Sequence, residues 1–228
     1  MIEAGAESTS STINSCFKYL AANPRTQTCA HAELDQVVGA SRSPTFADQA
    51  NLPYISAIVK ETLRIRPSSD NGVPHYTSTS ITYKNFFIPK HSIVSINQYA
   101  LFYNPAQFPE PEKFIPERFL RNGLLKELEF EQDKVPERFV FGAGRRICPG
   151  MHHAQNSLFI AIAKVLWACE IKAPVDSEGR EQEVDTSDWA YEDGRFTVPR
   201  PFKLRLIPRQ VNTSEIVAAE WSAAQARR

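Results

Sequence analysis

The sequence predicts a mainly α-helical fold with small β-sheets, and three observations support this fold class. Apolar residues recur at helical spacing in four segments, residues 1–22, 28–38, 52–65 and 151–171. Short alternating or β-branched runs predict strands at 80–83, 87–96 and 202–206. Prolines at positions 105, 109, 111 and 116 exclude both a helix and a central strand from that stretch.

The composition is that of a globular chain with one large domain or two small ones. The 228 residues are 42% hydrophobic and 23% charged, which argues against disorder. Lys+Arg and Asp+Glu each number 26, so the net charge does not favour nucleic acid or an anionic membrane as a partner. The four cysteines do not have the spacing that is typical of disulfide-bonded domains, which favours free thiols in a reducing compartment. The start has no signal-peptide pattern, and no apolar run reaches the roughly 20 residues of a membrane span.

The most informative stretch is the glycine-rich loop 141–150, which precedes the last long apolar helix pattern. Its glycines allow a close backbone approach to a flat ligand. A thiolate at Cys148 is a strong metal ligand, and nearby arginines and a helix N-terminus would offset its charge. Two other interpretations fit the residues alone. One is a plain turn before a buried helix, and the other is a zinc site with His152 and His153, although no C-x-x-C pair is present.

This loop resembles the cysteine-ligand loop of the cytochromes P450, the haem-thiolate monooxygenases. The family pattern is F-x-x-G-x-R-x-C-x-G, which fixes five positions in ten. Each of them matches here: Phe141, Gly144, Arg146, Cys148 and Gly150.

The resemblance implies a role for each matching side chain around a haem b cofactor. Cys148 would be the axial ligand of the haem iron. Arg146 would contact a haem propionate, and Phe141 would pack beside the sulfur. Gly142 and Gly150 would let the loop backbone lie against the cofactor.

The start of the first predicted helix resembles a second family pattern, [A/G]-G-x-[D/E]-[T/S]. By residues alone, the segment also fits an ordinary N-cap with an acid near the helix start. The resemblance implies that Ala4 and Gly5 line an oxygen pocket in the distal helix. Glu7 would be the acid and Ser8 the alcohol of a proton-delivery pair, with Thr9 as a neighbouring hydroxyl.

Two further motifs stand between these segments in the family's order. Glu61 and Arg64 stand at positions i and i+3 of a predicted helix and resemble the family's E-x-x-R motif, a buried ion pair. Arg118, in an aromatic-x-P-E-R-F segment, would join them in a charged cluster. His75 resembles a basic residue that reaches a haem propionate, although a surface histidine in a loop is the simpler alternative.

The resemblance covers about residues 3–208 and implies the C-terminal portion of the P450 fold, from the distal helix onward. We expect residues 1–208 to form this portion and residues 209–228 to be a helical or disordered tail. The resemblance is closest to the microsomal, fungal secondary-metabolism type. It implies an apolar organic substrate, O2, and electrons from NADPH through NADPH-cytochrome P450 reductase.

The portion of the family fold that precedes the distal helix has no counterpart in this sequence. The intact family member would lie on the cytosolic face of the endoplasmic reticulum membrane, held there only through that missing N-terminal part. The alternative to a working monooxygenase is a truncated, catalytically incompetent haem-binding fragment of one.

Overall fold

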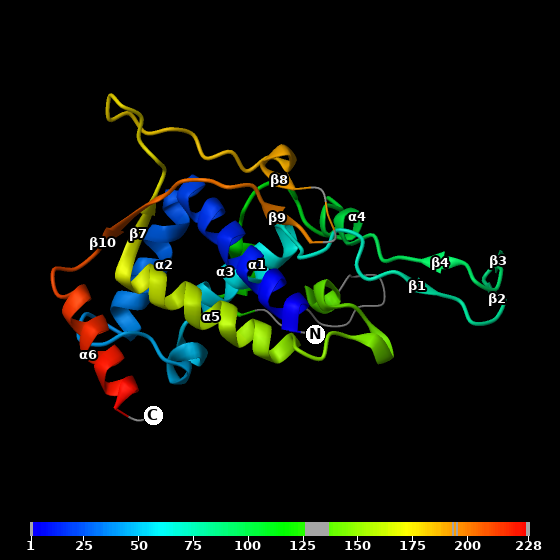
Figure 1. Cartoon of the computed structure of the whole chain (residues 1–228), viewed down its shortest axis with the longest axis horizontal. Helices are drawn as coiled ribbons and strands as arrows, with labels where there is room; N and C mark the ends of the chain where they lie inside the picture. The colour runs from blue at the N-terminus through cyan, green and yellow to red at the C-terminus, as the bar shows by residue number, and fades with distance from the viewer. Residues whose placement is uncertain (1, 126–136, 193, 195, 227–228) are drawn as a thin grey trace.

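A computed structural model of the chain describes residues 2–125, 137–192, 194 and 196–226, without the side chains of residues 2–4, 137 and 138. The predicted fold class is confirmed, because the body of the structure consists of long helices and each sheet is small (Figure 1). The α-helices are α1 (Ile2–Ala22), α2 (Pro24–Val37), α3 (Pro53–Ile65), α4 (Gln98–Phe102), α5 (Met151–Ala168) and α6 (Thr213–Gln225). Short 3-10 helices are η1 (Phe46–Asn51), η2 (Pro116–Phe119), η3 (Glu137–Phe141), η4 (Gly144–Arg146) and η5 (Asp188–Ala190).

The strands of the described residues form two-stranded antiparallel sheets. The pairs are β1 (His75–Tyr76) with β4 (Ile93–Val94), β2 (Ile81–Tyr83) with β3 (Phe86–Ile88), β5 (Leu120–Arg121) with β6 (Leu124–Leu125), β7 (Cys169–Lys172) with β10 (Arg205–Pro208), and β8 (Tyr191–Glu192) with β9 (Val198–Pro199). Two-stranded ribbons are marginal by themselves in water. The pairs β5–β6 and β7–β10 pack against the helical body, which supports them.

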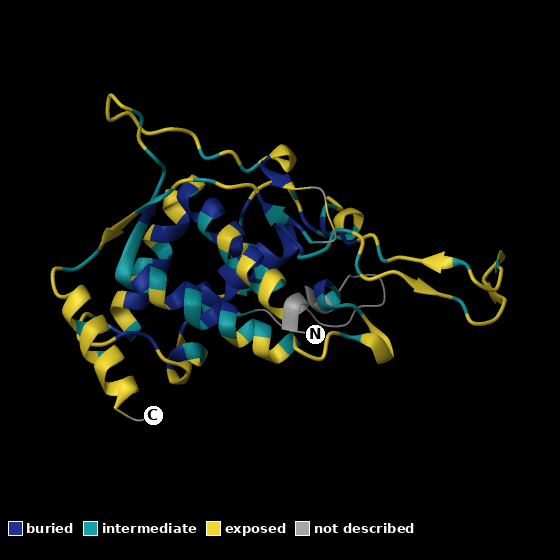
Figure 2. Ribbon diagram, viewed as in Figure 1, coloured by how far each residue is buried: buried dark blue, intermediate teal, exposed yellow. Residues whose placement is uncertain are grey.

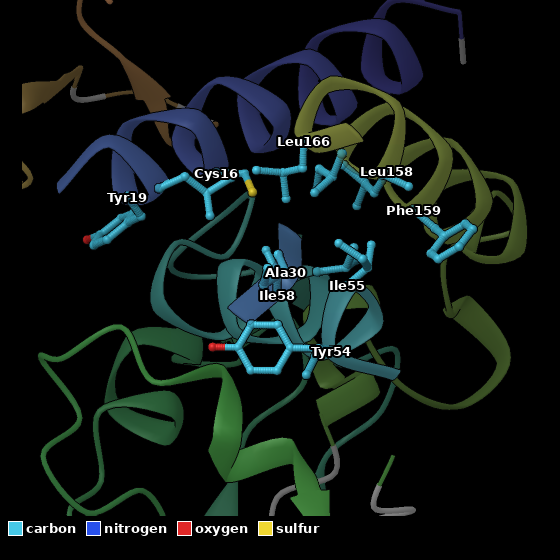
Figure 3. Packing of buried hydrophobic residues seen from close by; sticks show 14 of the residues in the cluster. Cys16, Tyr19, Ala30, Tyr54, Ile55, Ile58, Leu158, Phe159 and Leu166 are labelled. Atoms are coloured by element: carbon cyan, nitrogen blue, oxygen red, sulfur yellow. The ribbon is translucent and has the colours of Figure 1, made fainter. Parts of the chain in front are cut away.

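The hydrophobic core lies where α1, α2, α3 and α5 meet (Figures 2 and 3). Cys16 of α1, Ile55 and Ile58 of α3, and Leu166 of α5 are fully buried there. Helix α3 is buried on nearly all its faces, as expected for a helix at the centre of a helical domain. It is the element around which the other three long helices pack.

Two predicted helix boundaries differ from the observed ones by more than one residue. Helix α2 begins at Pro24 rather than at residue 28, since proline fits the first helical position. The predicted helix 151–171 is wrong at its end, because α5 stops at Ala168 and β7 follows. Gln27 of α2 stabilises this change: its amide donates to the Ile171 carbonyl at 2.7 Å and accepts from the Ile171 N–H at 2.8 Å.

The strands β1 to β4 form a narrow arm that projects from the helical body (Figure 1). Figure 2 shows that the arm is mostly exposed. Its apolar side chains include Phe86 and Ile93, which are 70% and 77% exposed. The predicted turn at Lys84 is confirmed, with a left-handed φ of 52° at that residue.

Helix α6 lies in the segment expected to be a tail. Its N-cap residue, Asn212, makes no side-chain cap bond. Glu220 instead accepts hydrogen bonds from the Ser43 N–H at 2.9 Å and the Ser43 hydroxyl at 2.5 Å, and it pairs with Lys164 of α5. A domain boundary at residue 208 stays a prediction. No helix within the described ranges is long and apolar enough to cross a bilayer.

The buried thiol of Cys16 makes stability sensitive to alkali. Burial raises the pKa of Cys16 to about 12, and the hydroxyl of Thr62 only partly offsets this. The unfolded chain loses the thiol proton near pH 8.5, while the folded chain keeps it, so stability is complete below that pH and falls as the pH rises towards 12. We expect the free energy of unfolding to fall by about 1.4 kcal/mol between pH 7 and 9.5 because of Cys16.

Urea unfolding at several pH values checks this expectation, with Cys16→Ala as the test variant and Cys29→Ala as the control. Cys16→Ala should flatten the decline in the free energy of unfolding over this range, whatever its effect at pH 7. An unchanged slope in Cys16→Ala would contradict the assignment.

Candidate functional site

The loop that carries Cys148 is shaped by two glycines in left-handed conformations. Gly142 has φ of 81° and Gly144 has φ of 65°, a region that other residues rarely adopt. These two reversals bring the chain back on itself, so that the Cys148 N–H donates to the Phe141 carbonyl at 2.8 Å. Helix α5 then begins at once, with the Met151 N–H on the Cys148 carbonyl at 3.3 Å. The thiol is therefore held by the backbone just before a helix N-terminus.

The face of the loop around the thiol is open. Cys148 and Arg146 are exposed, and nothing lies within 4 Å of the position that a Cβ on Gly144 would take. A Cβ on Gly150 would lie 3.9 Å from Cys148 Sγ, which is an ordinary contact. Phe141 is half-buried and packs against the hydrophobic core. The loop thus has one side anchored in the core and one side, with the thiol, accessible to a ligand.

Gln98 of α4 ties the beginning of the loop to the body, and sequence reasoning did not single it out. Its buried amide donates to the Phe139 carbonyl at 2.8 Å and lies 3.4 Å from the Val140 carbonyl. No motif in the sequence marks this residue, since its partners lie about forty positions away and only the fold brings them together. Gln98 is a positioning residue for the loop.

The three charged residues predicted to cluster do so: Glu61 and Arg64 are buried and Arg118 is half-buried. Glu61 accepts from Arg64 Nε at 2.7 Å and Nη2 at 2.9 Å, and from Arg118 Nε at 3.1 Å. The Ile115 N–H adds a fourth bond to Glu61 at 2.9 Å. Arg64 also donates to the Phe102 carbonyl at 2.9 Å, so its fork geometry is used in full. Glu61 and Arg64 are therefore a buried ion pair and not a pair on the exposed surface of the helix.

Helices α1 and α5 pack against each other, and α5 begins directly after the cysteine loop. Figure 3 shows them crossing near Cys16 and Leu166, with their N-terminal parts diverging from that crossing. The start of α1 carries the predicted proton-delivery residues. The packing therefore joins the helix that carries these residues to the helix that begins just after Cys148.

The predicted acid–alcohol segment lies on continuous helix. Glu7 is exposed, while Ser8 and Thr9 are half-buried. The Ser10 hydroxyl donates to the Glu7 carbonyl at 3.0 Å, and the Thr12 hydroxyl donates to the Ser8 carbonyl at 2.9 Å. Such back-bonds loosen a helix locally.

The predicted oxygen-pocket residues lie one turn earlier in α1. The space beside Gly5 is open, with nothing within 4 Å of an added Cβ. The predicted contact of the Ala4 side chain lies outside the described residues. The predicted roles of Ala4 and Gly5 in an oxygen pocket therefore stay predictions.

His75 lies on β1 at the base of the arm, opposite Val94 of β4, and is exposed. Within the described ranges, no hydrogen bond or ion pair joins His75 or Arg146 to another side chain. Both side chains are therefore accessible to an anionic group.

The donor set distinguishes between a protein-only metal site and a macrocycle. Among the residues that the structure describes, no three His, Cys, Asp or Glu side chains gather into a group that could hold a metal ion. A structural zinc needs about four such ligands. One accessible thiol, with the remaining ligands supplied by a macrocycle, fits a haem and leaves the zinc alternative unsupported.

The family model of cytochrome P450 matches residues 1–189. The chain belongs to the cytochrome P450 family. Cytochrome P450 monooxygenase pgmC of Aspergillus terreus is 44% identical over 227 residues, which cover 98% of this chain and 42% of that protein. Cytochrome P450 monooxygenase verL of Clonostachys rogersoniana is 38% identical over 227 residues, with 99% and 41% covered. Cytochrome P450 monooxygenase macC of Penicillium terrestre is 35% identical over 228 residues, with 99% and 42% covered.

These comparisons confirm the predicted family and agree with the predicted fungal secondary-metabolism type. The chain spans less than half the length of these P450 relatives. The prediction that it corresponds to the C-terminal portion of the P450 fold agrees with this coverage and with the helical architecture.

Proposed function

We propose that this chain supplies the haem-thiolate half of a monooxygenase, with Cys148 as the axial ligand of haem b. The observation that carries the proposal is the accessible thiol of Cys148, whose backbone N–H bonds to the Phe141 carbonyl and closes a loop that contains two left-handed glycines. The side chains of Arg146 and His75 are exposed, and no hydrogen bond or ion pair joins them to another side chain among the described residues, so both can donate hydrogen bonds to the haem propionates. Phe141 covers the loop from the core side.

When bound, a thiolate-ligated haem supplies the activation of O2, so that one oxygen atom enters an apolar organic substrate and the other leaves as water. This reaction consumes two protons and two electrons. Glu7 and Ser8, with Thr9 as the neighbouring hydroxyl, are the groups of this chain that would hold and pass the protons. The Glu61 cluster has a different task, which is to hold the folded body beneath the cysteine loop.

The electrons would come from NADPH through NADPH-cytochrome P450 reductase. The exposed Arg145 beside the cysteine loop is a candidate contact for that partner. In the intact protein we place this chemistry on the cytosolic face of the endoplasmic reticulum membrane. These assignments of partner and membrane rest on the family relationship. They do not rest on a contact observed within this chain.

A second candidate is a haem-binding fragment without catalytic competence. The observation that favours it is the coverage of less than half the length of the relatives. Monooxygenase turnover by this chain alone, with reductase and NADPH, would exclude it. Haem binding without turnover would support it.

The test of the ligand assignment is the reduced, carbon-monoxide difference spectrum of the purified chain after haem supplementation. We expect a strongly red-shifted Soret band in the unaltered chain, because thiolate ligation shifts this band. Cys148→Ser should lose the red-shifted band entirely. Cys169→Ser is the matched control, because Cys169 is a half-buried thiol in β7 and should leave the spectrum unchanged.

A red-shifted band that survives in Cys148→Ser would overturn the ligand assignment. A chain that takes up no haem alone, but gains the band when the N-terminal portion of a relative is supplied, would show an intact ligand loop in an incomplete domain. Absence of the band under both conditions would contradict the proposal.

A further inference from the structure

A cavity of about 810 Å³ lies away from the cysteine loop, between the C-terminal part of α1, helix α4 and the segment 183–189. Its volume is in the range of small-molecule sites. None of the residues assigned above to the haem site lines it. The family relationship and the proposed function therefore do not account for it.

Tyrosine rings form the floor and one wall of the cavity. Tyr19 of α1 is buried at the floor. Tyr99 of α4 stacks on Tyr103, with ring centroids 4.3 Å apart and planes inclined by 13°. Tyr99 is 39% exposed, so one face of the stacked pair is accessible. The face of an aromatic ring attracts cations through its quadrupole.

Arg66, the arginine among the described lining residues, is held by the protein through two of its three nitrogens. Arg66 donates to Asp188 Oδ1 at 2.7 Å and to the Thr186 carbonyl at 2.6 Å. Its guanidinium also lies over the rings of Tyr191, at 4.4 Å, and Tyr19, at 5.9 Å. Asp188 balances the charge of Arg66, so this pair contributes no net charge to the cavity.

Three further carboxylates surround the cavity. Within the described part of the chain, Glu112 and Glu183 make no ion pair, and Asp185 accepts a hydrogen bond from the Ser187 N–H at 2.9 Å. The nearby amine of Lys18 is directed elsewhere, since it donates to the Ala190 carbonyl and lies over the ring of Tyr191 at 5.0 Å. The lining thus combines accessible aromatic faces with an excess of negative charge.

We propose that this cavity binds a small organic ammonium ion. The cation would lie on the accessible face of Tyr99, where the ring attracts it and the carboxylates of Glu183 and Asp185 balance its charge. Neutral molecules of the same shape lack both attractions. The carboxylates around the cavity disfavour an anion there. Asp188 and the Thr186 carbonyl hold two nitrogens of Arg66, while its buried Nε has no hydrogen-bond partner among the described residues.

The test uses isotope-labelled tryptophan, because the three tryptophans of the chain report from three environments. Trp189 lines the cavity and is 87% exposed. Trp221 lies on α6 and is an exposed control. Trp167 is buried, with its indole N–H on the Gly39 carbonyl, and reports whether a variant is folded. Trp189→Phe assigns the Trp189 indole signal.

Choline is titrated into the full chain, and 3,3-dimethyl-1-butanol, its neutral isostere, is titrated in parallel. We expect choline to shift the Trp189 signal but not the Trp221 signal, with binding roughly tenfold tighter than that of the alcohol. Tyr99→Leu should weaken choline binding roughly tenfold, and Glu183→Gln/Asp185→Asn about threefold or more. Glu215→Gln, an acid on α6 outside the cavity, should have no effect.

Equal shifts at Trp189 and Trp221, or equal affinity for choline and its neutral isostere, would overturn the proposal. Unchanged choline binding in Tyr99→Leu, with the Trp167 signal intact, would overturn it as well. None of these outcomes depends on haem binding, so the result is separate from that of the proposed function.

Discussion

Glu61→Ala is expected to lower the free energy of unfolding by about 3–5 kcal/mol. Glu61 is completely buried and accepts four hydrogen bonds, three from the side chains of Arg64 and Arg118 and one from the Ile115 N–H. Removing the carboxylate leaves a buried guanidinium without its counter-charge in a medium that solvates charge poorly. The loss of the pair's own attraction is the smaller part of the effect.

Urea unfolding followed by far-UV circular dichroism measures this change. The matched control is Glu110→Ala, which breaks an exposed ion pair with Lys113 at the same i, i+3 spacing and should leave the unfolding free energy nearly unchanged. Similar losses in the two variants would show that burial of the Glu61 cluster contributes nothing. A further variant, Arg118→Lys, keeps the charge but loses the fork and should fall between them.

Trp167→Ala is expected to cost about 3–5 kcal/mol of unfolding free energy. Trp167 is the largest of the fully buried side chains in the described part of the chain. Its ring fills the core beneath the end of α5, and its indole N–H donates to the Gly39 carbonyl just beyond α2 at 2.8 Å. Truncation leaves a cavity that the four surrounding helices can close only in part.

Two further variants separate the causes of this loss. Trp167→Phe removes the indole donor but keeps most of the ring, so it should cost less than Trp167→Ala. Trp221→Ala removes a tryptophan that is 66% exposed on α6 and should have little effect on stability. A Trp167→Ala chain as stable as the Trp221→Ala chain would contradict the assignment of Trp167 to the core.

Local sequence signals predicted the helices well where the signal and the packing coincide. Proline at position 24 marks the junction between α1 and α2, and the apolar stripe of residues 52–65 gives α3 almost to the residue. The predicted end of α5 was wrong because Cys169 and Ile171 on either side of Glu170 carry no local signal that stops a helix. Pairing with β10 and the bonds to Gln27 decide that segment, and no periodicity reports a partner so distant in the chain.

The residues that form the candidate site could be identified from the sequence, because their types and spacing carry the chemistry. The positions that support them could not. Gln98 has no motif, and its contacts to Phe139 and Val140 exist only in the folded chain. Arg66 likewise has no motif, although it lines a cavity with Tyr19 and Asp188 and lies over the ring of Tyr191.

By itself, the sequence determined the family, the identity of the thiol ligand candidate and the order of its motifs. These depend on residue types at short, fixed spacings, such as the five matching positions around Cys148 and the i, i+3 pair of Glu61 and Arg64. Tertiary structure alone decided that Gln98 holds the start of the cysteine loop, that α5 gives way to β7, and that tyrosines and carboxylates from distant segments share one cavity. The reason is physical: burial and charge neutralisation are properties of neighbours in space, and a linear pattern specifies only neighbours along the chain.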